Sequence, residues 1–198
     1  MTDLQDLNRR AAMTSLAGLS LTGTTVASAA AEGAGKGATS KVLVACFSRT
    51  GNTRVVAGLL RRAFSADSFE IAPAVPYPDE YLATVEQARI ERDRGVRPAL
   101  RATVPDAASY DTILLGFPIW GETAPPIIRS FLSAHDLSGK SVIPFITHGG
   151  YGPGDSQKVI AAHAPRARLQ QGFLMQGEQE RQVMERVNSW LREAPIRR

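Results

Sequence analysis

The sequence predicts an α/β fold in which a parallel sheet is covered by helices on both faces. Short apolar runs rich in β-branched residues alternate along the chain with segments whose apolar residues fall at helical spacing. The runs are continuously apolar, as in 113–115, which suits strands buried on both faces. After residue 40 no internal repeat interrupts this alternation, so it favours one parallel sheet rather than separate helical and strand layers.

Each expected element follows from its own pattern. The apolar runs predict strands over 41–47, 68–71, 112–117, 141–147 and 169–175. The segments with helical spacing predict helices over 52–64, 78–94, 125–134, 154–164 and 179–192. Prolines at 76, 78, 98 and 105 indicate a longer, less regular connection between the second and third strands.

Length and composition exclude several classes of protein. The chain has 198 residues, of which 43% are hydrophobic and 21% charged, as expected for one globular domain. Its net charge of +4 comes from basic residues scattered along the sequence, so no nucleic-acid partner is expected. A single cysteine, Cys46, excludes an internal disulfide and a cysteine-based zinc site, and we interpret it as a small buried hydrophobe. No metal site is expected.

The first 31 residues have the parts of an export signal. Arg9 and Arg10 precede an uncharged stretch over 11–31 that contains the small-residue pattern at 27–29, and the paired arginines indicate the twin-arginine route. Residues 32–40 are a Gly-rich linker. We therefore expect a periplasmic or secreted protein with no stable membrane span after processing. An uncleaved membrane anchor and a disordered cytoplasmic tail are the alternatives.

The loop after the first strand has the composition of a phosphate-binding turn. It comprises Ser48, Arg49, Thr50, Gly51, Asn52 and Thr53, and a helix follows directly. A phosphate there would meet the free N–H groups of a helix N-terminus, with hydroxyl donors beside it and a glycine that allows close approach. Arg49 either adds charge to the phosphate site or projects into solvent. The alternative is an ordinary capped turn. The glycine pattern of neither the P-loop nor the dinucleotide fingerprint is present.

Three segments in order resemble the flavodoxin family. Residues 47–53 resemble its FMN-phosphate loop, 110–120 its third strand and first flavin-flanking loop, and 144–152 its fourth strand and second flavin-flanking loop. The similarity extends over 41–176, and 76–78 and 97–100 are typical of a bacterial flavodoxin-like subgroup. The resemblance implies a flavodoxin-like domain over 41–198, a three-layer α/β/α sandwich with a five-stranded sheet of order 2-1-3-4-5, and FMN as cofactor.

The same resemblance implies the residues around the flavin ring. They are Pro118, Ile119, Trp120, Gly121, Glu122 and Thr123 in one loop, and Thr147, His148, Gly149, Gly150, Tyr151 and Gly152 in the other. Trp120 and Tyr151 are the expected aromatic walls, and Gly121 stands where many relatives have a second tryptophan. We hypothesise that Glu122 lies at the ring edge and disfavours the anionic reduced flavin. His148 makes a structural hydrogen bond, donates to the flavin, or protonates a bound quinone.

Three functions remain open at this point. The first is electron transfer through FMN to a redox partner protein or a quinone-like small molecule. The second is an NAD(P)H-dependent quinone or nitro-compound reductase that uses FMN, although no nicotinamide site or catalytic residue is identifiable. The third is a flavin-free binding module on the same fold. Electron-transfer flavodoxins are usually acidic, whereas this chain is basic.

Overall fold

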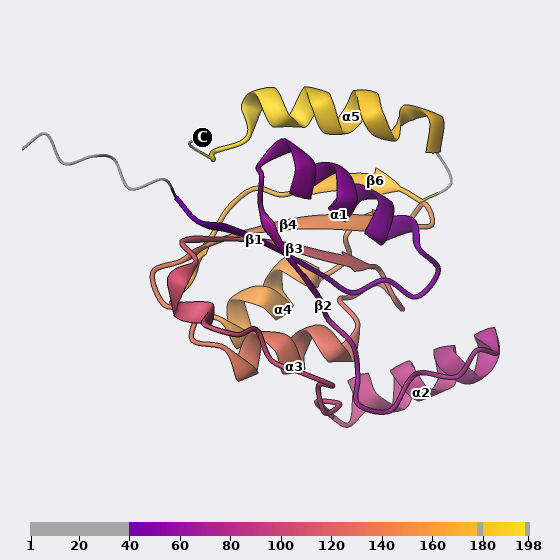
Figure 1. The fold of residues 1–198 in the computed structure, drawn as a ribbon. Coiled ribbons are helices and arrows are strands. Elements are labelled where there is room, and N and C mark those ends of the chain that lie inside the picture. Colours follow the sequence, from indigo (N-terminus) through magenta and orange to yellow (C-terminus); the bar gives the residue numbers. More distant parts are fainter. Residues whose placement is uncertain (1–39, 178–179, 197–198) are drawn as a thin grey trace, which may run out of the picture. The chain divides into compact units, whose positions relative to one another are not determined.

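The computed structural model of the chain describes residues 40–177 and 180–196, which form a parallel sheet between helical layers (Figure 1). The strands are β1 (Val42–Cys46), β2 (Asp67–Glu70), β3 (Thr112–Pro118), β4 (Ser141–His148), β5 (Arg168–Leu169) and β6 (Phe173–Gln176). The helices are α1 (Asn52–Ala63), α2 (Tyr81–Asp93), the short 3-10 helix η1 (Ala107–Ser109), α3 (Pro126–Ala134), α4 (Ser156–His163) and α5 (Glu180–Glu193). The strand order β2-β1-β3-β4-β5 confirms the predicted α/β fold.

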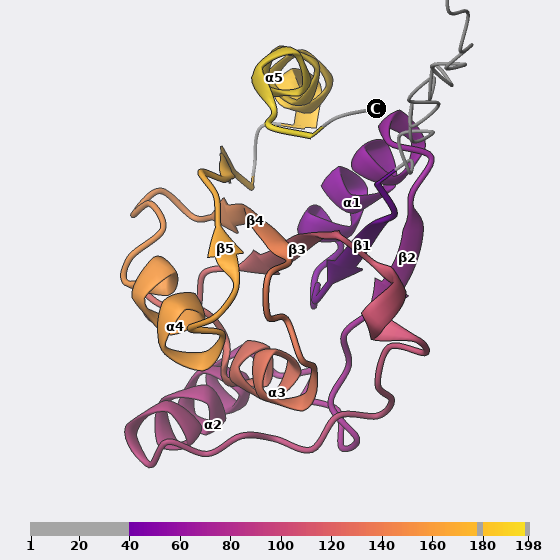
Figure 2. The ribbon, with the colours of Figure 1, turned by 90° about the vertical axis from the view of Figure 1, so that its left-hand side faces the viewer.

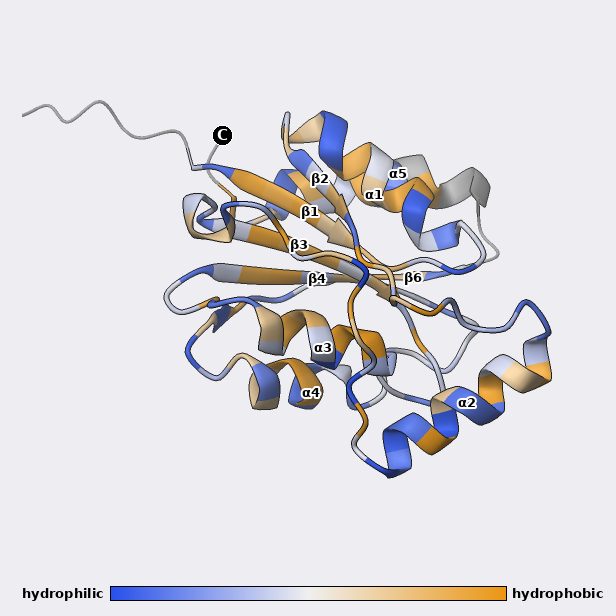
Figure 3. Ribbon diagram, turned by 60° about the horizontal axis from the view of Figure 1, so that its bottom comes forward, coloured by the Kyte–Doolittle hydropathy of each residue, from blue (hydrophilic) through white to orange (hydrophobic). Residues whose placement is uncertain are grey.

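Two apolar cores lie on opposite faces of the sheet. Alternate strand residues supply them, because successive side chains of a strand point to opposite faces: Leu43 belongs to one core and Val44 to the other. The first core contains residues of α3 and α4, and the second contains residues of α1 and α5. Figure 2 shows these helix pairs on the two sides of the sheet, and Figure 3 shows the hydrophobic strands between them.

The predicted fifth strand is interrupted. β5 pairs Leu169 with Val142, and β6 resumes by pairing Phe173 with Phe145, so the fifth strand has one more residue than β4 over this stretch. The Val142 carbonyl accepts a hydrogen bond from the Gln170 N–H, so the backbone groups of Val142 face the fifth strand. Pro144 lies two residues further along β4, and its backbone therefore faces the fifth strand as well. Because proline has no N–H to donate, the ladder breaks there and a bulge forms. The described chain therefore carries two short strands where one was predicted.

Helix α2 does not cover the sheet. None of its residues belongs to either apolar core, and Tyr81, Leu82 and Val85 are exposed. It lies beside α3 instead (Figures 1 and 3). The pattern over 78–94 predicted this helix, and the structure places it beside α3 and outside both apolar cores. This position makes α2 available to border the carboxyl ends of the strands.

The N-terminal predictions fall outside the described residues. The export signal over 1–31 and most of the linker over 32–40 belong to this part of the chain, so both stay predictions. Within the described ranges, no helix is long and apolar enough to span a bilayer.

Candidate functional site

Three predicted loops gather at one edge of the sheet. They follow β1, β3 and β4, which are neighbours in the strand order. The order reverses between β1 and β3, because β1 also pairs with β2 on its other side. Parallel sheets of this type bind ligands beyond the carboxyl ends of the strands at such a reversal. The predicted phosphate loop and the first predicted ring-flanking loop therefore lie at the favoured position.

The loop after β1 presents the N-terminus of α1. Gly51 precedes the helix at φ 99, and no side chain in the part of the chain that the structure describes caps the helix. The Gly51 N–H donates to Ser48 Oγ at 3.2 Å, which turns the loop tightly, and open space surrounds the position of a Cβ at Gly51. The first N–H groups of an α-helix have no partner within the helix, so this end offers donors and a favourable dipole to an anion.

Buried hydrogen bonds connect this loop to the loop after β4. Thr53 Oγ1 and Thr147 Oγ1 lie 2.8 Å apart, and both residues are buried. The Ile119 N–H donates to the Thr147 carbonyl at 2.8 Å, which ties in the loop after β3. Two predicted site residues thus make structural contacts at the point where the three loops meet.

The loop after β3 closes as a tight turn between Trp120 and Thr123. The Trp120 N–H donates to the Thr123 carbonyl at 3.0 Å, and Gly121 and Glu122 between them have φ values of 56 and 62. Glu122 is strained there, because a left-handed backbone suits glycine and not glutamate. The Thr123 hydroxyl is buried and finds no hydrogen-bond partner among the described residues.

A contact from the loop after β4 holds this turn. The Asp155 N–H donates to the Glu122 carbonyl at 3.1 Å. A Cβ at Gly154 would overlap that carbonyl oxygen, so glycine is required for the close approach. Both predicted ring-flanking loops therefore hold one another in place.

Trp120 is held by two aromatic neighbours. Its ring centroid lies 5.2 Å from that of Phe47 and 4.9 Å from that of Tyr77, and both pairs are edge-to-face. The Tyr77 hydroxyl donates to the buried Glu91 carboxylate at 2.9 Å. Burial, and then this carboxylate, raise the pKa of Tyr77 above its usual range. The neutral phenol thus stays a donor, and it links α2 to the position of Trp120.

A cavity of about 370 Å³ lies beside Trp120. The loop after β1 contributes Arg49 and Thr50, and the loop after β3 contributes Pro118, Ile119, Trp120 and Gly121. The remaining lining residues come from α2: Tyr81, Thr84, Val85, Ala88, Arg89 and Arg92. The volume falls in the range of pockets for small molecules and cofactors.

The residues from α2 are the part of the site that the sequence analysis missed. The sequence analysis predicted a helix over 78–94, in which residues spaced by three and four form one face, but it assigned no site residue there. Only the three-dimensional position of α2 turns this face into a wall of the cavity.

The loop after β4 does not line this cavity. His148 Nδ1 accepts hydrogen bonds from the N–H groups of Gly150 and Gly152, at 3.1 and 3.3 Å. Gly149 and Gly150 are exposed, and the Tyr151 side chain is 87% exposed. The structure therefore shows His148 organising its own loop, and it leaves Tyr151 outside the lining of this cavity.

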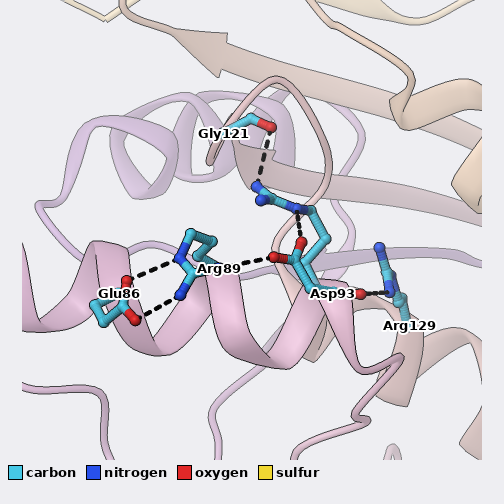
Figure 4. A network of polar contacts seen from close by, with 6 residues as sticks. Glu86, Arg89, Asp93, Gly121 and Arg129 are labelled. Carbon is cyan, nitrogen blue, oxygen red and sulfur yellow. Dashed lines mark hydrogen bonds and ion pairs between the residues drawn. The ribbon is translucent and has the colours of Figure 1, made fainter.

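Charged side chains of α2 form a network of polar contacts with one another and with neighbouring elements (Figure 4). Arg89 makes hydrogen bonds to both Glu86 carboxylate oxygens, at 2.8 and 2.7 Å, and one to Asp93 at 3.1 Å. Arg92 donates to Asp93 at 3.0 Å, and its Nη1 lies 3.5 Å from the Gly121 carbonyl oxygen. From α3, Arg129 donates to the Arg92 carbonyl at 3.4 Å. These contacts join α2 both to the turn at Gly121 and to α3.

Comparisons with known proteins agree with this architecture. The sequence model of the flavodoxin family matches residues 41–194. A candidate flavoprotein from Bacteroides eggerthii is 32% identical over 80% of this chain and 99% of its own, with a TM-score of 0.68. A second, from Bacteroides uniformis, is 34% identical over 75% and 98%, with a TM-score of 0.67.

A more distant structure shares the fold. It is a flavoprotein from Lactobacillus acidophilus in complex with FMN, 19% identical over 74% of this chain and 97% of its own, with a TM-score of 0.62. No curated protein gives a sequence match.

Proposed function

Because the chain belongs to the flavodoxin family, we propose that it binds FMN non-covalently and acts in electron transfer. The observation that carries the proposal is the meeting of three loops at the carboxyl ends of β1, β3 and β4, beside a cavity walled by Trp120. The FMN complex of the Lactobacillus acidophilus flavoprotein, which shares the fold, supports FMN as the cofactor.

The loop after β1 fits the phosphate of FMN. No side chain of the described residues caps the N-terminus of α1, and Ser48 and Thr50 precede it with hydroxyl groups, while the buried Thr53 hydroxyl is bonded to that of Thr147. The space beside Gly51 lets the backbone approach an anion closely. Backbone and hydroxyl donors of this kind hold a dianion without a lysine.

The loop after β3 fits the flavin ring. Pro118, Ile119 and Trp120 give the cavity a partly apolar wall next to the phosphate loop. Phe47 and Tyr77 fix the plane of the Trp120 ring before any ligand arrives. When bound, FMN supplies one- and two-electron chemistry, while the protein orients the ring and tunes its potential.

A second candidate is an FMN-dependent reductase of quinones or nitro compounds, with NAD(P)H as the electron donor. The net charge of +4 favours it, since electron-transfer flavodoxins are usually acidic. If the protein is an electron carrier, its partner is a redox protein or a quinone-like small molecule.

We also propose that the protein works outside the cytoplasm. Arg9, Arg10 and the apolar stretch after them support export by the twin-arginine route. Expression of the full chain in a bacterial host should give a periplasmic product cut near residues 29–31, as measured by its intact mass. Replacing both arginines by lysine should leave the full-length chain in the cytoplasm. A periplasmic yield unaffected by that change would contradict the route.

The electron-transfer proposal is tested by reconstitution. The purified full chain is mixed with FMN, freed of excess ligand, and reduced anaerobically with dithionite while its visible spectrum is followed. We expect bound flavin bands that bleach and return when ferricyanide is added. Bleaching by NADH or NADPH alone favours the reductase, and bleaching only by dithionite favours the carrier. A colourless protein would leave the flavin-free binding module as the function.

A further inference from the structure

We propose that the Arg92 guanidinium on α2 lies against the ring of bound FMN and raises its midpoint potential by stabilising the reduced, negatively charged flavin. The inference rests on the proposed FMN function and adds to it a residue that lies outside the three predicted loops. Three observations carry it: the space beside Gly121, the contacts that hold the guanidinium, and the positive charge of the cavity lining.

Gly121 leaves the space beside which the guanidinium lies. A Cβ at Gly121 would lie 2.5 Å from Arg92 Nη1, which is inside van der Waals contact. The same nitrogen lies 3.5 Å from the Gly121 carbonyl oxygen (Figure 4). A larger residue at position 121 would therefore push the guanidinium away from the turn, whereas glycine lets it pack directly against the backbone next to Trp120.

The guanidinium is held in place before any ligand arrives. Its Nε donates to Asp93 Oδ1 at 3.0 Å, and the Arg92 carbonyl accepts from Arg129 of α3 at 3.4 Å. The Arg92 side chain is 33% exposed, against 51% for Arg89 on the same helix. A preorganised side chain of this kind loses little conformational entropy when a ligand packs against it.

Arg92 lines the same cavity as Trp120, together with Pro118 and Ile119. The proposed function gives this space to the flavin ring, so a bound ring has both the indole and the guanidinium among its neighbours. A guanidinium is planar and more weakly hydrated than an ammonium group, and it packs well against aromatic rings. Arg92 therefore supplies a wall of the site that also carries charge.

The charged residues that line the cavity are all positive. They are Arg49, Arg89 and Arg92, and none of the described residues that line it carries a carboxylate. Glu86 and Asp93 pair with these arginines from outside the lining. The guanidinium groups thus lie nearer to a ring in the cavity than the carboxylates that offset them.

This charge acts differently on the two redox states of FMN. Two electrons and one proton added to oxidised FMN give a reduced ring with one negative charge, whereas the oxidised ring is neutral. A positive charge beside the ring lowers the free energy of the reduced form and leaves that of the oxidised form nearly unchanged. The midpoint potential of the bound flavin is therefore higher with Arg92 than without it.

The test measures the midpoint potential of FMN bound to the full chain at mildly alkaline pH, by equilibration with a reference dye while dithionite supplies the electrons. We expect Arg92→Gln to weaken the binding of reduced FMN about tenfold relative to oxidised FMN, which lowers the potential by about 30 mV. Arg92→Lys keeps the charge and should restore most of this loss. Arg94→Gln is the matched control, because Arg94 is exposed just after α2 and does not line the cavity. An unchanged potential in Arg92→Gln, or an equal decrease in Arg94→Gln, would overturn the proposal.

A second variant tests the space at Gly121. Gly121→Asn places a side chain against the guanidinium, and asparagine tolerates the φ of 56 at this position. It should lower the potential in the unmodified chain and have no further effect in Arg92→Gln. An unchanged potential in Gly121→Asn, or an equal decrease in both backgrounds, would also overturn the proposal. A titration with oxidised FMN, made before dithionite is added, separates these results from failure of the proposed function, in which FMN does not bind the unmodified chain.

Discussion

Thr53 and Thr147 share a buried hydrogen bond of 2.8 Å between their hydroxyl groups, although they are 94 residues apart in the sequence. Thr53 lies in the first turn of α1 and Thr147 near the end of β4. The bond therefore sets the distance between the proposed phosphate site and the loop after β4. It makes the geometry of the site depend on the packing of α1 against the sheet.

The losses of stability from removing each hydroxyl of this pair should not add up in the double variant. Thr53→Val or Thr147→Val leaves a buried hydroxyl without its partner, at a cost of about 1–3 kcal/mol in the free energy of unfolding. The double variant should cost less than the sum of the two single changes. Urea unfolding of the four proteins measures this coupling, and additive losses would show that the two hydroxyls do not interact.

Cys46 should make the stability fall at alkaline pH. Burial raises the pKa of its thiol to about 12, while Arg54 acts in the opposite direction. The unfolded thiol ionises near pH 8.5, so its contribution is intact below that pH and is lost as the pH rises towards 12. Relative to Cys46→Val, the free energy of unfolding should drop by about 1–2 kcal/mol between pH 8 and pH 10. A difference that is constant with pH would mean that the folded thiol ionises normally.

Tyr77→Phe should loosen α2 and Trp120 together. Among the described residues, the change leaves the Glu91 carboxylate, which is 9% exposed, with only its hydrogen bond from Gln87. We expect a loss of about 1–3 kcal/mol in the free energy of unfolding. The tryptophan emission should also shift to longer wavelength, because Tyr77 contacts Trp120. Tyr81→Phe serves as the control at an exposed position on α2, and an equal effect there would contradict the role assigned to Glu91.

Glu122→Gly should stabilise the turn after β3. Glutamate at φ 62 is strained, and glycine removes the strain, so a gain of about 0.5 kcal/mol is expected after the greater chain entropy of unfolded glycine is subtracted. Glu122→Ala removes the same carboxylate but keeps the strain, so it should give no gain. Thermal unfolding of the two variants distinguishes backbone strain from loss of charge.

The same residue tests the predicted electrostatic effect on FMN. Glu122→Gln removes a negative charge without freeing the backbone, so the midpoint potential of bound FMN should rise. The potential is measured by equilibration with a reference dye. An unchanged value would place the Glu122 carboxylate too far from the ring to act.

The order of strands and helices was predictable because each element carries its own local signal. β3 and β4 are buried apolar runs, and α1 has apolar residues at helical spacing, so these were found within one or two residues of their bounds. The break in the fifth strand depends on Pro144 in the neighbouring strand. The hydropathy pattern of one segment contains no information about the strand that pairs with it.

The candidate site was only partly predictable for the same reason. The residue types at Gly51 and Trp120 indicate binding loops in the sequence itself. The strand order then brings those loops to one edge of the sheet. The wall formed by α2 depends instead on long-range contacts, namely Tyr77 with Glu91 and Arg129 with the Arg92 carbonyl. These contacts, and not the helical pattern itself, decide which surface α2 faces.

The most direct measurement is a titration of the full chain with FMN and with riboflavin, followed by quenching of flavin fluorescence. We expect each chain to bind one FMN, far more tightly than riboflavin, because only FMN carries the phosphate that the N-terminus of α1 would hold. The double variant Ser48→Ala/Thr50→Ala should narrow this difference, while Ser133→Ala, on the exposed side of α3, should not. Equal binding of the two flavins, or no quenching by either, would contradict the binding of FMN through its phosphate at the N-terminus of α1.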